Sequence, residues 1–345
     1  MLQDIIRENI LRCSPGEKLP PELDMAKLYN VNRGTISKAL TSLAQEGLIT
    51  RKPKQGSIVV DRKQRKLPYR IGVLLDIARG HIYGMMHSLV LQQIQQNHYF
   101  PLNLDVYMDT DMTFQSYWRE VLDTKPEFIV ADGFKGFPFE ILNENMSRIK
   151  NLIFINRVET SLRFPAVYIL SDYETGGYLG AQHLIDLGHR ELLIIPHHYD
   201  PSPNTCDAMR LRGIKKAMEE RGLDYENATV LQYDSFEMLA NKLKEKLSKT
   251  KKTVGIFAFA DQLARVVEGV LKQIRLEAGT DYNIIGYFDT PYATDFEPSL
   301  TSVSINPAEI ATQLGNVLKN EAFDEKVIMV EPTLIQRNST NKIRS

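Results

Sequence analysis

The chain has 345 residues, of which 43% are hydrophobic and 25% are charged, and this is the composition of an ordinary folded protein. It excludes a disordered chain, a collagen and a disulfide scaffold, and the length predicts two or three domains. No stretch approaches the run of about 18 apolar residues that a membrane span needs, and the first residues lack the order of a signal peptide. We therefore expect a cytoplasmic protein. Cys13 and Cys206 have no metal-ligand spacing, which suits a reducing compartment.

The net charge of −1 hides an asymmetry along the chain. Residues 1–70 hold fourteen Lys and Arg against seven Asp and Glu, whereas the remainder holds 28 against 36. A basic head on an acidic body is typical of a protein that binds nucleic acid with one end. A basic tail without a partner is the alternative that charge alone leaves open.

Helical spacing is clear in the basic head. The apolar face of the first predicted helix consists of Leu2, Ile5, Ile6 and Ile10. This helix stops at Ser14-Pro15-Gly16, and a short second helix follows Pro20-Pro21 with Met25, Ala26 and Tyr29 facing inward.

A third helix begins after Asn32, a good N-cap, with Val31 and Ile36 placed for a hydrophobic staple. It ends at Gly47, where the chain turns left-handed. Its inner face consists of Ile36, Ala39, Leu40 and Leu43, and its polar outer face of Arg33, Gly34, Ser37, Lys38 and Thr41. Two β-like runs follow, Leu48–Arg51 and Ser57–Val60, joined by a basic turn over residues 52–56. Three helices and a hairpin predict an α+β winged helix-turn-helix, whose third helix fits the major groove of DNA.

The head also resembles the GntR family of bacterial regulators over residues 2–60. The matching segments are Pro15–Pro20, Val31–Ile36, Ala39-Leu40, Glu46–Ile49 and Gln55–Ser57. The resemblance implies a DNA-binding domain in residues 1–60, with Arg33 as the first candidate for a base or phosphate contact. The predicted DNA-binding residues are Arg33, Gly34, Thr35, Ser37, Lys38, Thr41, Lys52, Lys54, Gln55 and Gly56.

Two departures separate the head from the family pattern. Pro21-Glu22-Leu23 stands where the family commonly has Ser-Glu-Arg, and Ser37 stands where an arginine is often found. The base contacts must therefore differ, and the operator does not follow by analogy. A winged helix that makes only protein contacts is the alternative, and DNA affinity that falls with salt would exclude it.

Residues 61–68 are polar, strongly basic and end in Pro68, which predicts a linker that is solvated or touches phosphates. Residues 69–340 alternate β runs with amphipathic stretches in two comparable series, typical of α/β units with parallel sheets. Two such halves predict two lobes with a cleft between them. Ligands of open α/β sheets bind at the carboxyl ends of the strands, so we expect one there.

The body resembles the ligand-binding domain of LacI-type repressors. The most specific segment is Asp172–Arg190, and support comes from Arg210–Gly213, Phe257–Ala264, Ile284–Asp289, Pro298–Val303 and Leu334–Thr340. The resemblance implies a periplasmic-binding-protein type I fold, three crossover strands and a homodimer. Lobe one is expected over 69–168 and 290–318, and lobe two over 169–289 and 319–340.

Polar and aromatic residues near the strand ends are the candidates for effector binding. They are Asp76, Arg79, His81, Tyr83, Asp132, Phe134, Phe137, Asn156, Arg157, Asp172, His197, Tyr199, Arg210, Asp261, Phe288 and Asp289. Carboxylates and arginines suit vicinal hydroxyls and aromatic rings stack on a sugar, so a carbohydrate effector is predicted. The resemblance implies that Arg210, Asp261 and Asp289 align with or adjoin family ligand positions. Ala260 and Phe288 depart from it, where many sugar binders have Asn and Asp.

Structural roles compete with several of these assignments. Asp172 and Asp261 both precede predicted helices and are helix-cap candidates as much as ligand contacts. His197-His198 lacks a third spaced ligand, so no metal and no cofactor are predicted. A structural role is favoured for His189, and Gly176-Gly177 fits no phosphate-binding motif.

Together these features predict a ligand-responsive bacterial transcriptional regulator, favouring a repressor that binds a near-palindromic operator as a dimer and is released or retuned by a sugar. The alternatives are a cytoplasmic sugar-binding protein and a metabolite enzyme without a DNA role. The basic head argues against the first. No nucleophile–base or metal constellation supports the second, so the chain is not expected to be an enzyme.

Overall fold

The computed structural model describes residues 2–45, 47–52, 55–60, 70–75, 81–103, 123, 126, 128–133, 144, 151–158, 165–196, 202, 205–248, 254–295 and 297–342. The chain divides into two compact units, one built mainly from residues 1–71 and the other mainly from residues 102–345. No helix in these described ranges combines the length and the hydrophobicity that a membrane span requires. The predicted linker at 61–68 lies outside the described residues, as does most of the stretch between residues 104 and 150.

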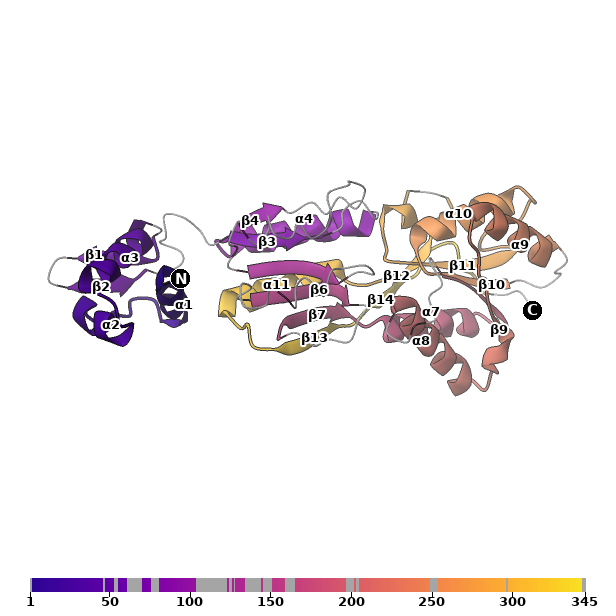
Figure 1. Ribbon diagram of the computed structural model, residues 1–345. Coiled ribbons are helices and arrows are strands. Elements are labelled where there is room, and N and C mark those ends of the chain that lie inside the picture. Colours follow the sequence, from indigo (N-terminus) through magenta and orange to yellow (C-terminus); the bar gives the residue numbers. More distant parts are fainter. Residues whose placement is uncertain are drawn as a thin grey trace. The chain divides into compact units, whose positions relative to one another are not determined.

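The N-terminal domain has the predicted order of three helices and a hairpin. Its elements are α1 (Leu2–Arg12), α2 (Glu22–Leu28), α3 (Arg33–Gln45), β1 (Ile49–Lys52) and β2 (Gly56–Val59) (Figure 1). The two strands pair antiparallel, with Ile49 opposite Val59. Each strand lies one residue away from its predicted position, because the exposed turn between them gives only a weak signal for its own ends.

The core of this domain follows from the spacing of apolar residues. Ile36, Leu40 and Leu43 of α3 are fully buried. Ile5 corrects the predicted face of α1, because its side chain is 45% exposed. Ile6 is buried, and a neighbour one residue away lies about 100° around a helix, so the two cannot share a narrow buried stripe.

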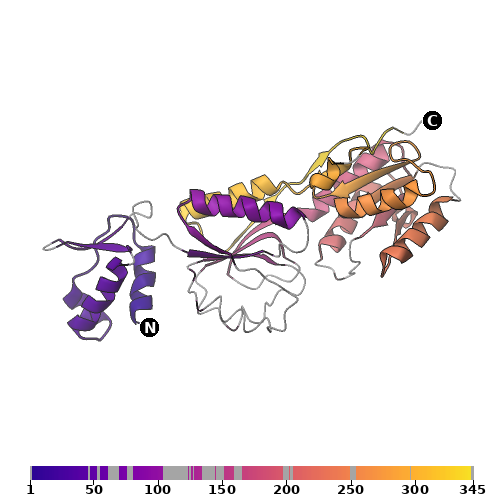
Figure 2. The same ribbon diagram turned by 90° about the horizontal axis from the view of Figure 1, so that it is seen from above.

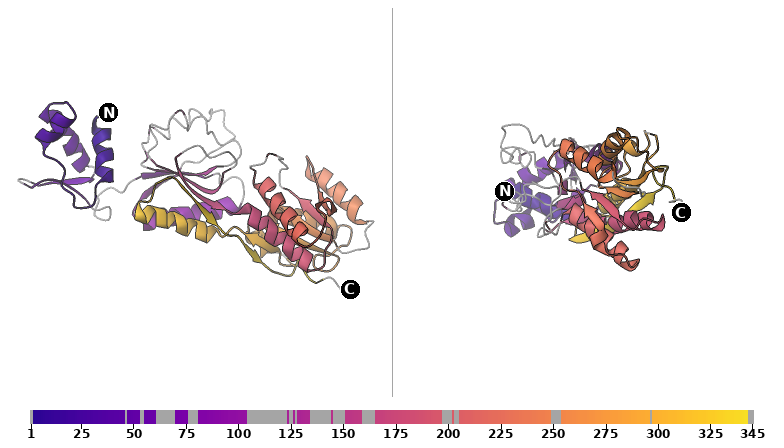
Figure 3. Two further views of the ribbon diagram at one scale, coloured as in Figure 1. Left: turned by 90° about the horizontal axis from the view of Figure 1, so that it is seen from below. Right: turned by 90° about the vertical axis from the view of Figure 1, so that its right-hand side faces the viewer.

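The first sheet of the body has the strand order β13-β7-β6-β5-β3-β4. These strands are β3 (Arg70–Leu74), β4 (Phe100–Asn103), β5 (Phe128–Gly133), β6 (Asn151–Val158), β7 (Val167–Ser171) and β13 (Lys326–Val330). The pairings of β5 with β6, β6 with β7 and β7 with β13 are parallel, as predicted. The helices α4 (His81–Gln96) and α11 (Pro307–Asn320) lie on the same face of this sheet (Figure 2; Figure 3).

The second sheet has the order β14-β12-β11-β10-β8-β9. Its strands are β8 (Leu192–Ile195), β9 (Ala228–Val230), β10 (Val254–Ala258), β11 (Tyr282–Tyr287), β12 (Thr301–Ser304) and β14 (Thr333–Ile335). β8 pairs parallel with β9 and β10, and β11 pairs parallel with β10 and β12. β14 pairs antiparallel with β12. The helices are α7 (Tyr173–Asp186), α8 (Cys206–Glu220), α9 (Phe236–Ser248) and α10 (Asp261–Lys272), with short 3₁₀ turns η4 (Tyr225–Asn227) and η5 (Pro291–Ala293).

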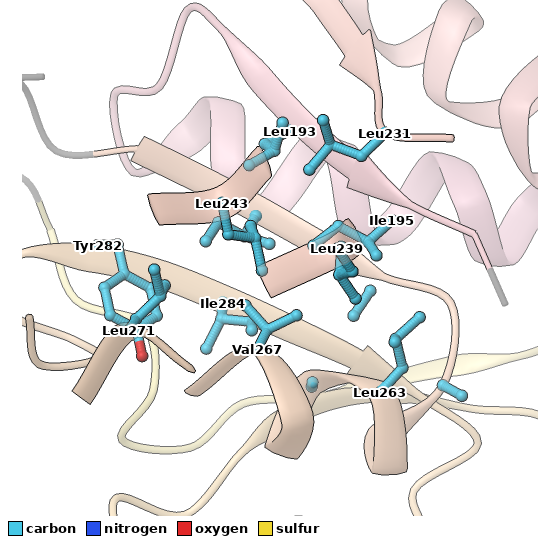
Figure 4. Packing of buried hydrophobic residues seen from close by; sticks show 14 of the residues in the cluster. Leu193, Ile195, Leu231, Leu239, Leu243, Leu263, Val267, Leu271, Tyr282 and Ile284 are labelled. Carbon is cyan, nitrogen blue, oxygen red and sulfur yellow. The ribbon is translucent and has the colours of Figure 1, made fainter. Parts of the chain in front are cut away.

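The helices of the second sheet cover both of its faces. In Figure 1, α7 and α8 lie on one side of the strands and α9 and α10 on the other. Leu239 and Leu243 of α9 and Val267 of α10 pack with the strand residues Leu193 and Ile284 (Figure 4). Each of these five residues is at most 1% exposed, so this apolar layer holds the helix pair against the sheet.

The sheets exchange strands near the C-terminal end of the chain. β12 lies in the second sheet and β13 in the first, whereas the predicted lobes have 290–318 in lobe one and 319–340 in lobe two. Within the segment 290–318, α11 packs on the first sheet, against β6, β7 and β13. Both runs have ordinary strand composition, and only pairing with β11 or β7 decides which sheet each one joins.

Candidate DNA-binding surface and effector site

The outer face of α3 carries most of the predicted DNA-binding residues. Exposed there are Arg33, Gly34, Thr35, Lys38 and Thr41, and Ser37 is partly buried. Asn32 caps the helix, because its Oδ1 accepts hydrogen bonds from the backbone N and the Oγ1 of Thr35 at 2.8 and 3.1 Å. The predicted N-cap is confirmed, and the start of α3 is fixed with its polar side chains at the surface.

The tip of the wing lies between β1 and β2. Lys52, Gln55 and Gly56 are exposed, and Lys54 lies outside the described residues. The backbone N of Gln55 donates to the carbonyl of Lys52 at 3.1 Å, and Gly56 has a φ of +88° that favours glycine. The turn is therefore tight, and it leaves a basic side chain in solvent.

Two charged residues outside the predicted DNA-binding set also lie on this surface. Arg51 donates from Nη1 to the Oγ1 of Thr41 at 2.6 Å. Glu22 accepts from the Nε of Arg33 at 3.0 Å and from the Nη2 of Arg51. The hydrogen bond from Arg33 outweighs the opposing effect of burial and lowers the pKa of Glu22. The carboxylate therefore stays ionised between two arginines.

In the body, buried polar side chains connect the ends of β5 and β6 to the start of α7. The Nδ2 of Asn156 donates to the Oδ2 of Asp132 at 3.3 Å, and the Oη of Tyr173 donates to the Oδ1 of Asn156 at 3.2 Å. Asn156 has a φ of +70°, a left-handed conformation that asparagine tolerates better than most residues. These strand ends meet as predicted, and they form a chain of hydrogen bonds rather than separate polar groups.

Arg210 of α8 lies beside this chain in an aromatic environment. Its side chain is only 3% exposed, and its Nη1 donates to the Oδ1 of Asp207 at 2.9 Å. The Cζ atom lies between 4.1 and 5.2 Å from the centroids of four rings, those of Tyr173, Phe259, Tyr287 and Phe288. Cation–π attraction and one ion pair therefore hold a buried guanidinium. Its Nε has no hydrogen-bond partner within the described part of the chain.

Close helix packing places Arg210. A Cβ built on Gly177 of α7 would lie 2.1 Å from the carbonyl oxygen of Arg210, and one on Gly213 of α8 would lie 1.9 Å from the carbonyl oxygen of Glu174. Only glycine fits at such distances, so α7 and α8 approach backbone to backbone. This explains Gly177 by packing, in agreement with the absence of a phosphate motif.

Besides Asp132, other predicted carboxylates are also engaged in internal bonds. Asp172 is the N-cap of α7 and accepts from the backbone N of Thr175 at 2.9 Å, which supports the capping alternative. Asp261 accepts from the backbone N of Thr290 at 2.6 Å and from the Oγ of Ser302 at 2.5 Å. Burial nevertheless raises the pKa of Asp261 to about 6, although these hydrogen bonds oppose the shift.

Asp289 forms an ion pair with Arg337, whose Nη1 lies 2.7 Å from its Oδ1. Asp289 and Phe288 both have positive φ values, 52° and 93°, so the backbone after β11 is held in an unusual conformation. Phe288 uses it to turn toward Arg210, and its ring meets that of Tyr287 edge-on at 5.2 Å between centroids. The aromatic residue that departs from the family pattern thus contacts the central arginine.

Several predicted effector-site residues lie outside the described residues. They are Asp76, Arg79, Phe134, Phe137, His197 and Tyr199, together with the side chains of His81 and Arg157. Tyr83 is described and lies buried in α4. Among the described residues, no three His, Cys, Asp or Glu side chains are grouped to hold a metal ion. His189 is buried beside Asn283, with 2.9 Å between its Nε2 and the amide Nδ2, which supports its structural assignment.

Two protein-family models match the chain. Residues 1–59 match the bacterial regulatory proteins of the gntR family, and residues 181–340 match the periplasmic binding protein-like domain. The first match covers the winged helix described above, and the second covers all six strands described for the second sheet, together with α11 and β13.

Curated relatives extend the similarity to nearly the whole chain. The arabinose metabolism transcriptional repressor of Halalkalibacterium halodurans is 24% identical, with 96% of this chain and 92% of the relative covered. The repressor of the same name from Geobacillus stearothermophilus is also 24% identical, with 96% and 94% covered. The HTH-type transcriptional repressor PurR of Vibrio vulnificus is 28% identical over 51% of this chain and 53% of its own.

Solved structures share the fold of the body. A LacI family transcriptional regulator from Enterococcus faecium with bound ribose has a TM-score of 0.65 at 18% identity, covering 80% of this chain and all of the other. These matches are named as transcriptional regulators, in agreement with the prediction that the chain is not an enzyme. The chain thus joins a DNA-binding domain of the GntR family to a LacI-like ligand-binding domain of the periplasmic-binding-protein fold.

Proposed function

We propose that the chain is a transcriptional repressor whose affinity for operator DNA is set by a small carbohydrate. The carrying observation is the union, in one polypeptide, of a GntR-type winged helix with a LacI-like domain whose strand ends meet at a buried arginine. Relatives named as arabinose metabolism repressors match over 96% of the chain, so they support this union as well as its parts. A DNA partner supports a cytoplasmic location for this activity.

The DNA-binding half of the proposal is a dimer that places two copies of α3 in successive major grooves of a near-palindromic operator, about 34 Å apart. Exposed Arg33, Lys38 and Thr41 on α3 support this assignment, and so does exposed Lys52 on the wing. Binding that rests on such cations weakens as salt rises, because each phosphate contact releases a counterion.

The effector half of the proposal centres on Arg210. Its unpartnered Nε and the rings of Tyr173 and Phe288 offer a donor beside apolar faces, a combination that suits a sugar hydroxyl and the C–H face of a sugar ring. Effector binding closes the lobes and changes the spacing of the two DNA-binding domains. Coupling of about 1–3 kcal/mol would change operator affinity by about 5- to 150-fold.

A thermal-shift screen of the full chain tests the effector. The panel holds pentoses, hexoses, disaccharides, pentitols, uronic acids and nucleosides, with L-arabinose and D-ribose included because relatives are named for or bound to them. A binder at 100 times its Kd stabilises the fold by about 2.7 kcal/mol. The screen is repeated on Arg210→Ala. Its matched control is Arg212→Ala, which removes an exposed arginine from the same helix as Arg210.

Operator binding is tested next, by gel shift on fragments upstream of the gene and its neighbours, with and without the sugar that shifts Tm. A specific complex that the sugar weakens by fivefold or more is the expected result. If no fragment binds better than random duplex, the chain is not the proposed repressor. If a complex forms and no sugar on the panel moves it, the carbohydrate assignment is wrong, and phosphorylated or nitrogenous ligands should be screened.

A further inference from the structure

Three charged side chains from three elements meet on the DNA-binding surface. Glu22 is the first residue of α2, Arg33 the first of α3 and Arg51 the third of β1. The Oε2 of Glu22 accepts from the Nε of Arg33 at 3.0 Å, and its Oε1 accepts from the Nη2 of Arg51. One carboxylate therefore uses both oxygens, one on each arginine.

The two arginines differ in what remains of their hydrogen-bonding capacity. Arg51 donates from Nη1 to the Oγ1 of Thr41 at 2.6 Å and to the carbonyl of Ser37 at 3.2 Å, and from Nη2 to Glu22. Both of its terminal nitrogens are thus bound to protein acceptors. Arg51 braces α2, α3 and the wing, and it has little left to offer DNA.

Arg33 is bound only through Nε. Its side chain is 67% exposed, and within the described residues its two terminal nitrogens make no hydrogen bond. A guanidinium held at Nε keeps its opposite edge intact, with two parallel donors facing outward. That edge matches the O6 and N7 acceptors of guanine in the major groove.

Resting on the proposed DNA-binding function, we infer that Glu22 is a positioning residue for base reading. It holds Arg33 so that the terminal nitrogens face a guanine, and Arg51 holds Glu22 in place. The side chain of Glu22 is only 19% exposed, so it acts through Arg33 rather than by touching DNA. Sequence specificity is then a property of the α2–α3–β1 junction as well as of α3.

Electrostatics alone predicts the opposite effect for this residue, and this makes the inference sharp. Replacing Glu22 by Gln removes a negative charge from a surface that faces phosphates, so affinity for any duplex should stay level or rise. The positioning role predicts that guanine discrimination falls even so. Guanine discrimination is expected to fall by about two- to tenfold. This factor corresponds to the entropy cost of ordering one long side chain, Arg33, on binding.

The experiment uses the full chain and a duplex selected by the wild-type protein from a randomised library. Each guanine is replaced in turn by 7-deazaguanine, which lacks the N7 acceptor. The wild type is expected to lose about fivefold or more at one guanine in each half-site, the low end for an arginine–guanine pair. Arg33→Ala should show no such loss at that guanine, and in Glu22→Gln the loss should be smaller by about twofold or more, down to no loss at all.

Asp24→Asn is the matched control, because it removes the same charge from an exposed position on the same helix and should keep the full guanine sensitivity. Arg51→Lys keeps the charge but cannot bridge Glu22, Ser37 and Thr41 together, so it should fall between wild type and Glu22→Gln. In an Arg33→Ala background, Glu22→Gln should add nothing at that guanine. Melting curves establish that each variant is folded.

The inference is overturned if folded Glu22→Gln discriminates 7-deazaguanine as well as the wild type does. It is also overturned if selected and random duplex weaken by the same factor, because that outcome reports a structural role alone. A failure of the proposed function looks different, since the wild type would then select no duplex at all. If Glu22→Gln does not fold, Arg51→Lys carries the same test, and full guanine sensitivity in that variant overturns the inference.

Discussion

The two arginine centres of this protein use charge in opposite ways. Arg33 is mostly in solvent and shares one acceptor, Glu22, with Arg51. Arg210 is buried under four aromatic rings with Asp207 as its ion-pair partner. An exposed guanidinium keeps its donors hydrated and ready to exchange water for DNA, at little cost to stability. A buried one is part of the core, so any change to it acts on the fold and on ligand binding together.

Arg210→Ala is expected to have the largest effect of the variants that test this contrast. It removes one side of the buried ion pair with Asp207, which costs about 3–5 kcal/mol of the free energy of unfolding, and it abolishes the effector-induced Tm shift. Calorimetry measures both. The double variant Asp207→Asn, Arg210→Gln should recover part of the stability and none of the effector response. An unchanged response in Arg210→Ala would remove Arg210 from the effector site.

The second largest effect is expected from Asp261, as a dependence of the free energy of unfolding on pH. Its pKa is raised to about 6 in the folded state from an ordinary value near 3.8, so the folded protein binds more protons between these limits. Stability from this group is therefore lost as pH rises from about 4 to about 6, by about 3 kcal/mol at most. The unfolding free energy of the wild type minus that of Asp261→Asn should decrease across this window. A flat difference would show that the carboxylate titrates normally.

Arg33→Ala tests the exposed side of the comparison and should change stability least. We expect affinity for the selected duplex to fall by about 1–3 kcal/mol, with melting temperature and effector binding unchanged. Affinity for random duplex should barely move if Arg33 reads a base, whereas a phosphate contact would weaken both and lower the salt slope by about one. Arg190→Ala, an exposed arginine of the body, controls for net charge. If Arg33→Ala lowered the affinities for DNA and for the effector equally, the proposal that separate domains bind them would be wrong.

Local signals predicted the N-terminal domain well, because its elements are defined by neighbours in sequence. Asn32 was predicted to cap α3 from its type and place, and it does so. The ion pairs of Glu22 join residues 11 and 29 positions apart and need the fold to appear. One available signal was the strand period, which puts Arg51 on the same side as buried Ile49, against α3.

The effector region was harder, because its groups meet across long stretches of sequence. The positions of the strand ends predicted that Asp132 and Asn156 lie close together, and a hydrogen bond joins them. The pairing of Asp289 with Arg337 spans 48 positions, and the sequence pattern of Asp289 is the same whether it binds a ligand or an arginine. Likewise, the strand composition of residues 326–330 did not reveal which sheet they join.

That late exchange of strands between the sheets has a consequence for how the protein is made. The described elements of the N-terminal domain come from residues 2–59, so this domain can fold once these residues have left the ribosome. Each sheet of the body takes an edge strand from residues 326–335. Neither sheet is complete until residues 326–335 have been made, so a nascent chain acquires its DNA-binding head well before the ligand-binding domain that is proposed to control it.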